Sequence, residues 1–179
     1  MTVKTRIYVS CLLLLSIFLE ASIIARAGVA ASGIGDDTKP VFQFAVFMNE
    51  EFKQSELDLD CQKRIRHILE AYHELVLMPH FRYAIQYLSK NDDRPLMGEL
   101  IKVLISYENA ADEELSFGLA NLFLANPKLV ESAYNKISFE EKRIIYRRLR
   151  EGSMNVSPRL SPSRRMEFKN RISALNPSP

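Results

Sequence analysis

Closely spaced helix boundaries over residues 108–150 constrain the fold of this chain more than any other feature of its sequence. Asn126 is a preferred N-cap residue, and Pro127 takes the first helical position, where a missing N–H breaks no hydrogen bond. Ser138 and Glu141 have the S-x-x-E spacing of a capping box. Links this short force neighbouring amphipathic helices to fold back on one another. The predicted helices are Asp112–Ala125, Pro127–Lys136 and Phe139–Glu151.

The segment after these helices is predicted to change from helix to loop and back to helix. Gly152 is placed to end the preceding helix in a left-handed conformation. Two Ser-Pro pairs then indicate a loop over Ser153–Ser163. Ser161 is expected to cap a basic C-terminal helix within residues 164–179. The thin apolar stripe of that helix consists of Met166, Ile172 and Leu175.

Apolar residues at three- and four-residue steps predict four more helices in the earlier part of the chain. They are Pro40–Lys53, a Ser55-capped helix to about Leu77, His80–Ser89 and Leu96–Tyr107. The last is the most apolar, so we expect it to be the central helix. Pro79 is expected to break the helix before it. The residues expected to face the core are Val41, Phe44, Ala45, Met48 and Phe52, followed by Leu57, Cys61, Ile65, Ile68, Tyr72 and Leu75.

About eight short helices with brief links predict an all-α domain. The pairing of successive short helices resembles HEAT-like and armadillo-like α-α superhelices. No repeated sequence signature accompanies that resemblance, and an irregular bundle over residues 40–152 is the alternative. The run 41–47 is also compatible with a short strand.

Residues 1–27 have the organisation of a secretory signal peptide. A charged start precedes the apolar run Ile7–Leu19, which is shorter than the roughly 20 residues of a spanning helix. Ala25-Arg26-Ala27 fits the small-x-small rule for cleavage, so the mature chain is expected to begin near Gly28. A retained membrane anchor is the alternative. Residues 28–39 are small and polar and are predicted to form a flexible arm.

Cleavage at that point would leave the mature chain electrically neutral. The full chain has 24 basic and 22 acidic residues, and 21 of each remain once residues 1–27 are removed. A neutral chain gives no general reason to expect nucleic acid as a partner. Cys61 is then the one remaining cysteine, so no intramolecular disulfide can form.

His67, Glu70 and His73 form the most suggestive metal-binding pattern in the sequence. Steps of three residues bring neighbouring side chains onto one side of a helix. Glu-x-x-His is half of the pattern found in di-iron bundles, and the second half is missing here. The residues also lie on the polar side of their helix. A solvated charged face is the preferred interpretation, and no cofactor is expected.

Motifs of nucleophilic catalysis and phosphate binding are missing from the sequence. There is no G-x-S-x-G turn, H-E-x-x-H pair or glycine-rich phosphate loop. Glu131-Ser132 resembles the catalytic Glu-Ser pair of lytic transglycosylases, but the downstream Gly-Leu-Met-Gln motif of that family does not follow. The sequence therefore favours a protein that is not an enzyme.

An excess of positive charge toward the C-terminus is the best clue to function. Between Phe139 and Ile172, ten cations face four carboxylates. A surface of this kind would attract an acidic protein or an anionic envelope surface. A dipolar but self-balanced surface is the preferred interpretation of these charges taken alone, because acidic residues earlier in the chain offset the excess. The ten cations are Lys142, Arg143, Arg147, Arg148, Arg150, Arg159, Arg164, Arg165, Lys169 and Arg171.

Part of this cluster is predicted to bind a partner protein. Tyr146 lies among arginines at helical spacing and could act as an anchor, because tyrosine and arginine dominate interface energetics. Charge reversal at Arg147 and Arg148 is expected to weaken binding without lowering stability. The predicted binding residues are Arg143, Tyr146, Arg147, Arg148, Arg150, Arg164 and Arg165.

The sequence thus favours an exported, non-enzymatic helical domain that binds another protein, as an adaptor, inhibitor or immunity-type factor does. It would lie in the periplasm of a Gram-negative host, or outside the cell. One alternative is an envelope enzyme or metal protein that uses His67, Glu70 and His73, with Glu131 as a further acid. Another is a carrier of an apolar ligand between helices.

Overall fold

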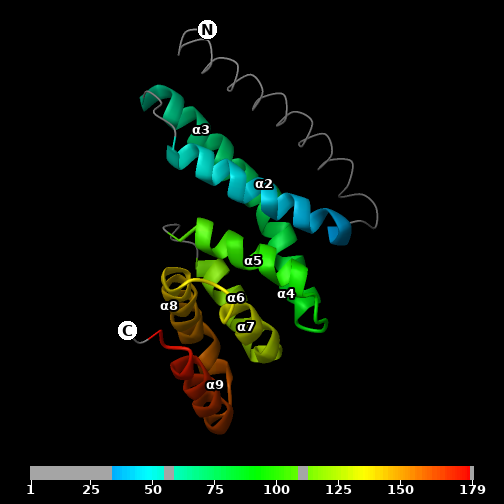
Figure 1. The fold of residues 1–179 in the computed structure, drawn as a ribbon, viewed down its shortest axis with the longest axis vertical. Coiled ribbons are helices and arrows are strands. Elements are labelled where there is room, and N and C mark those ends of the chain that lie inside the picture. Colours follow the sequence, from blue (N-terminus) through cyan, green and yellow to red (C-terminus); the bar gives the residue numbers. More distant parts are fainter. Residues whose placement is uncertain (1–33, 55–58, 109–112, 178–179) are drawn as a thin grey trace. The chain divides into compact units, whose positions relative to one another are not determined.

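Every regular element is helical in the computed structural model, which describes residues 34–54, 59–108 and 113–177. This confirms the all-α prediction, and the described residues from Thr38 onward form one compact bundle. None of the described helices combines the length and apolarity needed to cross a membrane. The α-helices are α2 (Ile34–Gln54), α3 (Leu59–Tyr72), α4 (Met78–Leu88), α5 (Arg94–Ser106), α6 (Glu113–Ala125), α7 (Pro127–Tyr134), α8 (Phe139–Val156) and α9 (Pro162–Ala174), as labelled in Figure 1.

Some predictions concern residues that the structure does not describe. The signal peptide, the first part of the arm and the N-cap predicted at Ser55 lie outside the described residues. The rest of the arm is helical, because α2 includes residues 34–39 and Pro40 lies inside it. Thr38 explains part of this difference. It is fully buried, and its hydroxyl oxygen lies 3.2 Å from Nδ1 of His80 in α4.

The capping box at the start of α8 is confirmed. The hydroxyl of Ser138 accepts from the N–H of Glu141, and the Glu141 carboxylate accepts from the N–H of Ser138 at 2.8 Å. Asn126 also lies at an N-cap, but the predicted role of its side chain is wrong. Its amide donates to the carbonyl of Leu88 at 3.0 Å and so joins the start of α7 to the end of α4.

A π-helical turn, η1 (His73–Leu77), connects α3 to α4. The N–H of Met78 donates to the carbonyl of His73, five residues earlier. The sequence predicts that Pro79 breaks the helix. The chain instead stays helical from α3 through η1 into α4, and Pro79 lies in the first turn of α4. The wider turn takes up one extra residue, which shifts the apolar stripe by about 100°. Leu75, predicted to face the core, is 74% exposed as a result.

The apolar stripe resumes in the new register beyond η1. Tyr72, the last residue of α3, is buried, and the next residue on its stripe is five positions later instead of four. From there the stripe again follows three- and four-residue steps. Its buried residues are Leu77, Phe81, Ala84 and Leu88.

Helix α6 shares the centre of the bundle with α5. Both pack against α4, α7 and α8, and the α6–α8 contact is the most extensive. Two glycines allow the neighbours of α6 to come close. A Cβ on Gly118 would lie 2.5 Å from the ring of Phe81 in α4. A Cβ on Gly152 in α8 would lie 2.0 Å from the carbonyl oxygen of Ser116 in α6.

Gly152 therefore does not end a helix, and this prediction from the sequence is wrong. Helix α8 passes through Gly152 and continues to Val156, where the 3-10 turn η2 (Ser157–Arg159) begins. Most of the predicted Ser153–Ser163 loop is consequently helical. Pro158 explains the end of α8, because a proline has no N–H to donate to the carbonyl four residues earlier.

Replacement of Gly152 by alanine is expected to destabilise the protein by about 1–3 kcal/mol, because the added methyl group meets the backbone of α6. Gly98→Ala is the matched control. Nothing lies within 4 Å of a Cβ on Gly98, and alanine favours a helix over glycine by up to about 1 kcal/mol. Urea unfolding of both variants measures the difference. Equal stability of the two variants would contradict the assigned close contact.

Candidate functional site

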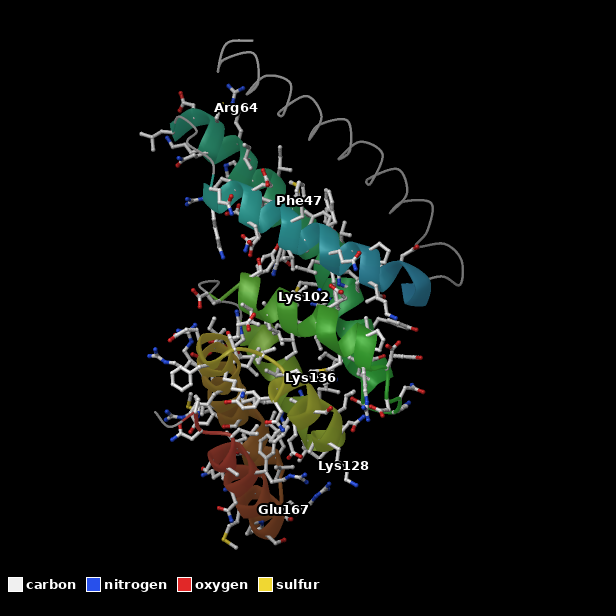
Figure 2. All side chains as sticks on the ribbon, viewed as in Figure 1. Phe47, Arg64, Lys102, Lys128, Lys136 and Glu167 are labelled. Carbon is white, nitrogen blue, oxygen red and sulfur yellow. The ribbon has the colours of Figure 1, made fainter. Side chains whose placement is uncertain are left out.

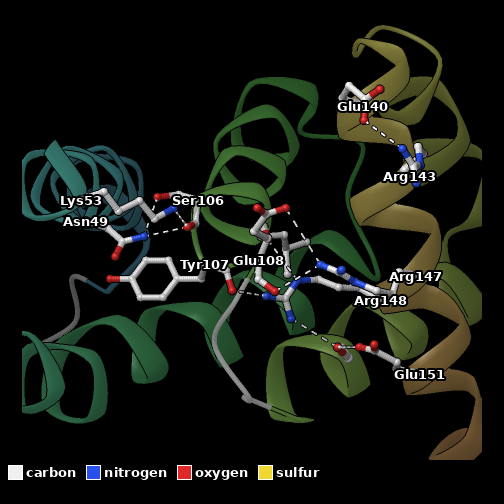
Figure 3. Close-up of polar contacts among 12 residues, drawn as sticks. Asn49, Lys53, Ser106, Tyr107, Glu108, Glu140, Arg143, Arg147, Arg148 and Glu151 are labelled. Carbon is white, nitrogen blue, oxygen red and sulfur yellow. Dashed lines mark hydrogen bonds and ion pairs between the residues drawn. The ribbon is translucent and has the colours of Figure 1, made fainter.

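Polar side chains of α2 and α8 contact the carboxyl end of α5 from two sides (Figure 3). The last carbonyls of a helix have no partner within it and carry partial negative charge. Asn49 and Lys53 of α2 both donate to the carbonyl of Ser106, at 2.7 and 2.6 Å. From α8, Arg147 donates to the carbonyl of Glu108 at 3.2 Å.

Arg148 makes the most extensive of these contacts. Its Nε donates to the carbonyl of Leu104 at 3.0 Å, and one terminal nitrogen donates to the carbonyl of Tyr107. The other terminal nitrogen lies 3.3 Å from the hydroxyl of Ser116, which donates to the carboxylate of Glu151. All three guanidinium nitrogens are thus engaged between α5, α6 and α8.

The placement of Arg148 corrects the predicted binding surface. The residue is only 3% exposed, so it belongs to the interior of the bundle. The expectation that its charge could be reversed without loss of stability is therefore wrong. Arg147 differs, since its side chain is 52% exposed and its guanidinium also lies 4.0 Å from the carboxylate of Glu108.

Helices α8 and α9 enclose a groove of about 520 Å³, called here the α8–α9 groove. Three of the predicted binding residues line it. Lys169 and the exposed side chain of Met154, which were not predicted to bind, line it as well. Within the groove, the guanidinium of Arg150 lies 6.0 Å from the ring centre of Tyr146. The lining residues are Tyr146, Arg147, Arg150, Glu151, Ser153, Met154, Lys169, Ile172 and Ser173.

The other predicted binding residues lie outside the groove. Arg143 is exposed and lies 3.3 Å from the carboxylate of Glu140 on the same helix. Arg165, in α9, donates to the carbonyls of Ser157 and Leu160 in the segment between α8 and α9. Arg164 is exposed at the start of α9. The structure thus brings together only Tyr146, Arg147 and Arg150 of the original set.

Helix α9 forms one wall of the groove because it docks firmly. Phe168 and Ile172 are buried, whereas Met166, predicted to face inward, is 64% exposed. The ring of Phe168 contacts that of Phe123 in α6, with centres 6.0 Å apart. Ile172 was predicted correctly, but sequence reasoning assigned Met166 to the stripe and missed Phe168.

A contact between α7 and α9 accounts for Glu131. Arg171 donates to the Glu131 carboxylate at 3.1 Å, which is the geometry of an ion pair. The contact explains the residue structurally and gives the resemblance to a catalytic Glu-Ser pair no further support.

The histidine pattern remains a set of local pairs. His67 and Glu70 lie 3.4 Å apart, and both side chains are largely exposed. His73 is mostly covered and lies 3.7 Å from the exposed carboxylate of Glu74. Among the residues that the structure describes, no three metal-ligating side chains are grouped so that they could hold an ion.

Buried Tyr72 and partly buried Tyr107 stay in their neutral form. Burial, together with the nearby Tyr107, raises the pKa of Tyr72 far above its usual value. Burial raises the pKa of Tyr107 to about 12. The hydroxyl of Tyr72 donates to the carbonyl of Val41 at 3.2 Å, which ties α3 to α2. Neither group can supply a phenolate at neutral pH.

These features define an all-α domain with a basic, partly apolar groove between two helices. Comparison with known protein families, with curated protein sequences and with solved structures finds no match to this chain. Any proposal about function therefore depends on the site itself.

Replacement of Arg148 by methionine is expected to cost roughly 3 kcal/mol of stability, because carbonyls buried beneath its guanidinium lose a charged donor. Arg147→Met is the matched control on the next residue of α8. It should cost under about 1 kcal/mol, because the side chain is half exposed. Chemical denaturation measures both variants. Similar losses in the two would show that Arg148 does not hold the end of α5.

Proposed function

We propose that this chain is an exported, non-enzymatic helical domain that binds another protein through the α8–α9 groove. The observation that carries the proposal is the pairing of exposed cations with exposed apolar surface in one hollow. Arg150 and Lys169 are exposed, and Met154 beside them is 68% exposed. Protein-binding surfaces commonly combine a charged rim with adaptable apolar and aromatic contacts.

The charges in the groove differ in how far they are already engaged. Arg147 is bound to Glu108, and the carboxylate of Glu151 accepts from Ser116. Arg150 and Lys169 have no carboxylate within ion-pairing distance among the described residues. These two cations therefore remain to bind carboxylates of a partner.

The chemistry of the groove favours an acidic segment that carries an apolar side chain. Carboxylates of such a segment would meet Arg150 and Lys169, and the apolar side chain would pack on Met154. Methionine suits this role because its flexible, polarisable side chain adapts to different shapes. Opposite charge across an interface also speeds encounter and sets orientation.

The double variant Arg150→Glu/Lys169→Glu is expected to weaken binding of an acidic peptide with a central leucine by about tenfold or more. Fluorescence anisotropy with labelled peptide measures the affinity, and crosslinked capture from the native envelope tests the cellular partner. The unfolding temperature should not change, because both side chains are exposed.

Lys63→Glu/Lys128→Glu is the matched control for this experiment. Both lysines are exposed on other helices, and the change in net charge is the same. The control should keep its affinity for the peptide and for the captured partner. Equal loss in both double variants would mean that only net charge matters, and the proposed groove would be abandoned.

Export is the second part of the proposal and is tested separately. Mass spectrometry of protein recovered from its host is expected to find a chain that begins near Gly28. Ala27→Phe, which removes the small residue at the cleavage position, should block this processing. Recovery of the wild-type chain from membranes with residues 1–27 still attached would instead support the retained anchor.

A further inference from the structure

A second hollow lies between α5 and α7 and reaches the start of α8. Its volume is about 320 Å³, at the lower end of the range for small-molecule pockets. We call it the α5–α7 slot. Most of its lining residues are apolar, and three are basic: Arg94, Lys102 and Lys136. The lining residues are Arg94, Met97, Gly98, Ile101, Lys102, Ile105, Leu129, Ser132, Ala133, Lys136, Ile137 and Glu141.

Gly98 is the residue that keeps this slot open. A glycine inside a helix costs about 1 kcal/mol relative to alanine, so its presence needs a reason. Gly118 and Gly152 have one, because neighbouring atoms occupy the place of a Cβ. Nothing lies within 4 Å of a Cβ on Gly98. Packing therefore does not require glycine at this position, and a larger side chain there would fill the slot.

The basic residues of the slot differ in their partners. Lys102 lies 3.1 Å from the carboxylate of Glu99, and Arg94 lies 3.5 Å from that of Asp92. Lys136 is exposed and has no ion pair within the part of the chain that the structure describes. It is the cation best placed to bind an anion from outside the chain.

Glu141, the one acid in the lining, is committed to the capping box. Its hydrogen bonds from the side chain and backbone of Ser138 lower the pKa of its carboxyl group. The carboxylate consequently serves the first turn of α8 and does not neutralise Lys136 by an ion pair.

We propose that the α5–α7 slot binds a single-chain anionic amphiphile, such as a free fatty acid. Its apolar chain lies over Gly98 between Ile101 and Leu129, and its carboxylate meets Lys136. A narrow, mostly apolar lining with one cation that lacks an ion pair suits a single apolar chain that ends in one anionic group. The proposal is independent of the α8–α9 groove.

Dodecanoate below its micelle concentration is the probe, and isothermal titration calorimetry measures its binding. Gly98→Leu is expected to weaken binding at least tenfold by filling the slot. The same variant should unfold at the wild-type temperature or above it, because the new side chain enters open space and leucine favours a helix over glycine. Unchanged affinity in a folded Gly98→Leu variant, or no binding by the wild type, would overturn the proposal.

Lys136→Glu tests the position of the carboxylate. It should weaken dodecanoate binding about tenfold and leave dodecanol binding unchanged, because the alcohol has no charge. Lys128→Glu is the control, since it makes the same change of charge on an exposed residue of α7 outside the slot (Lys128 and Lys136 are labelled in Figure 2). Equal loss in both variants would overturn the assignment of the carboxylate to Lys136.

The Arg150→Glu/Lys169→Glu variant separates the two proposals. It should bind dodecanoate as the wild type does, because neither residue lines the slot. Loss of dodecanoate binding in that variant would place the amphiphile in the α8–α9 groove and overturn the proposal for the slot. Loss of peptide binding alone leaves the slot proposal supported.

Discussion

The carbonyl groups at the end of α5 are the constraint on which the rest of the bundle depends. These groups have no partner inside their helix, and burying them unpaired would be costly. Asn49 and Lys53 come from one side, and Arg147 and Arg148 come from the other. The end of α5 thereby fixes the positions of both α2 and α8. Helix α8 in turn forms one wall of the α8–α9 groove.

Close approach of α8 to α6 is the second requirement. Gly152 lets the backbone of α8 contact that of α6, so the helix carrying Arg148 lies near enough for its guanidinium to span α5 and α6. The same contact aligns the following turns of α8, where Met154 lines the groove. A structural glycine and a buried arginine thus position side chains that themselves stay exposed.

Local signals in the sequence predicted the helices well, because capping and periodicity act within a few residues. The capping box at Ser138 is the clearest case. Predictions failed where a distant contact decides the outcome. Gly152 meets α6 rather than ending a helix, Asn126 reaches α4, and Arg148 lies inside. Of the candidate site, the basic helix was predicted, but Arg148 was assigned to its surface although helical spacing places it on the buried stripe of Ile145 and Leu149.

The π turn at η1 has a consequence for how this sequence can change. It acts as a one-residue insertion that the helix absorbs without forming a loop. The pattern of buried and exposed positions after the turn is offset by one residue from the pattern before it. We consequently expect a charged residue to be tolerated at Leu75, which is exposed, but not at Leu77, which is fully buried. Relatives that lack the extra residue would need a compensating deletion or a new core on one side of it.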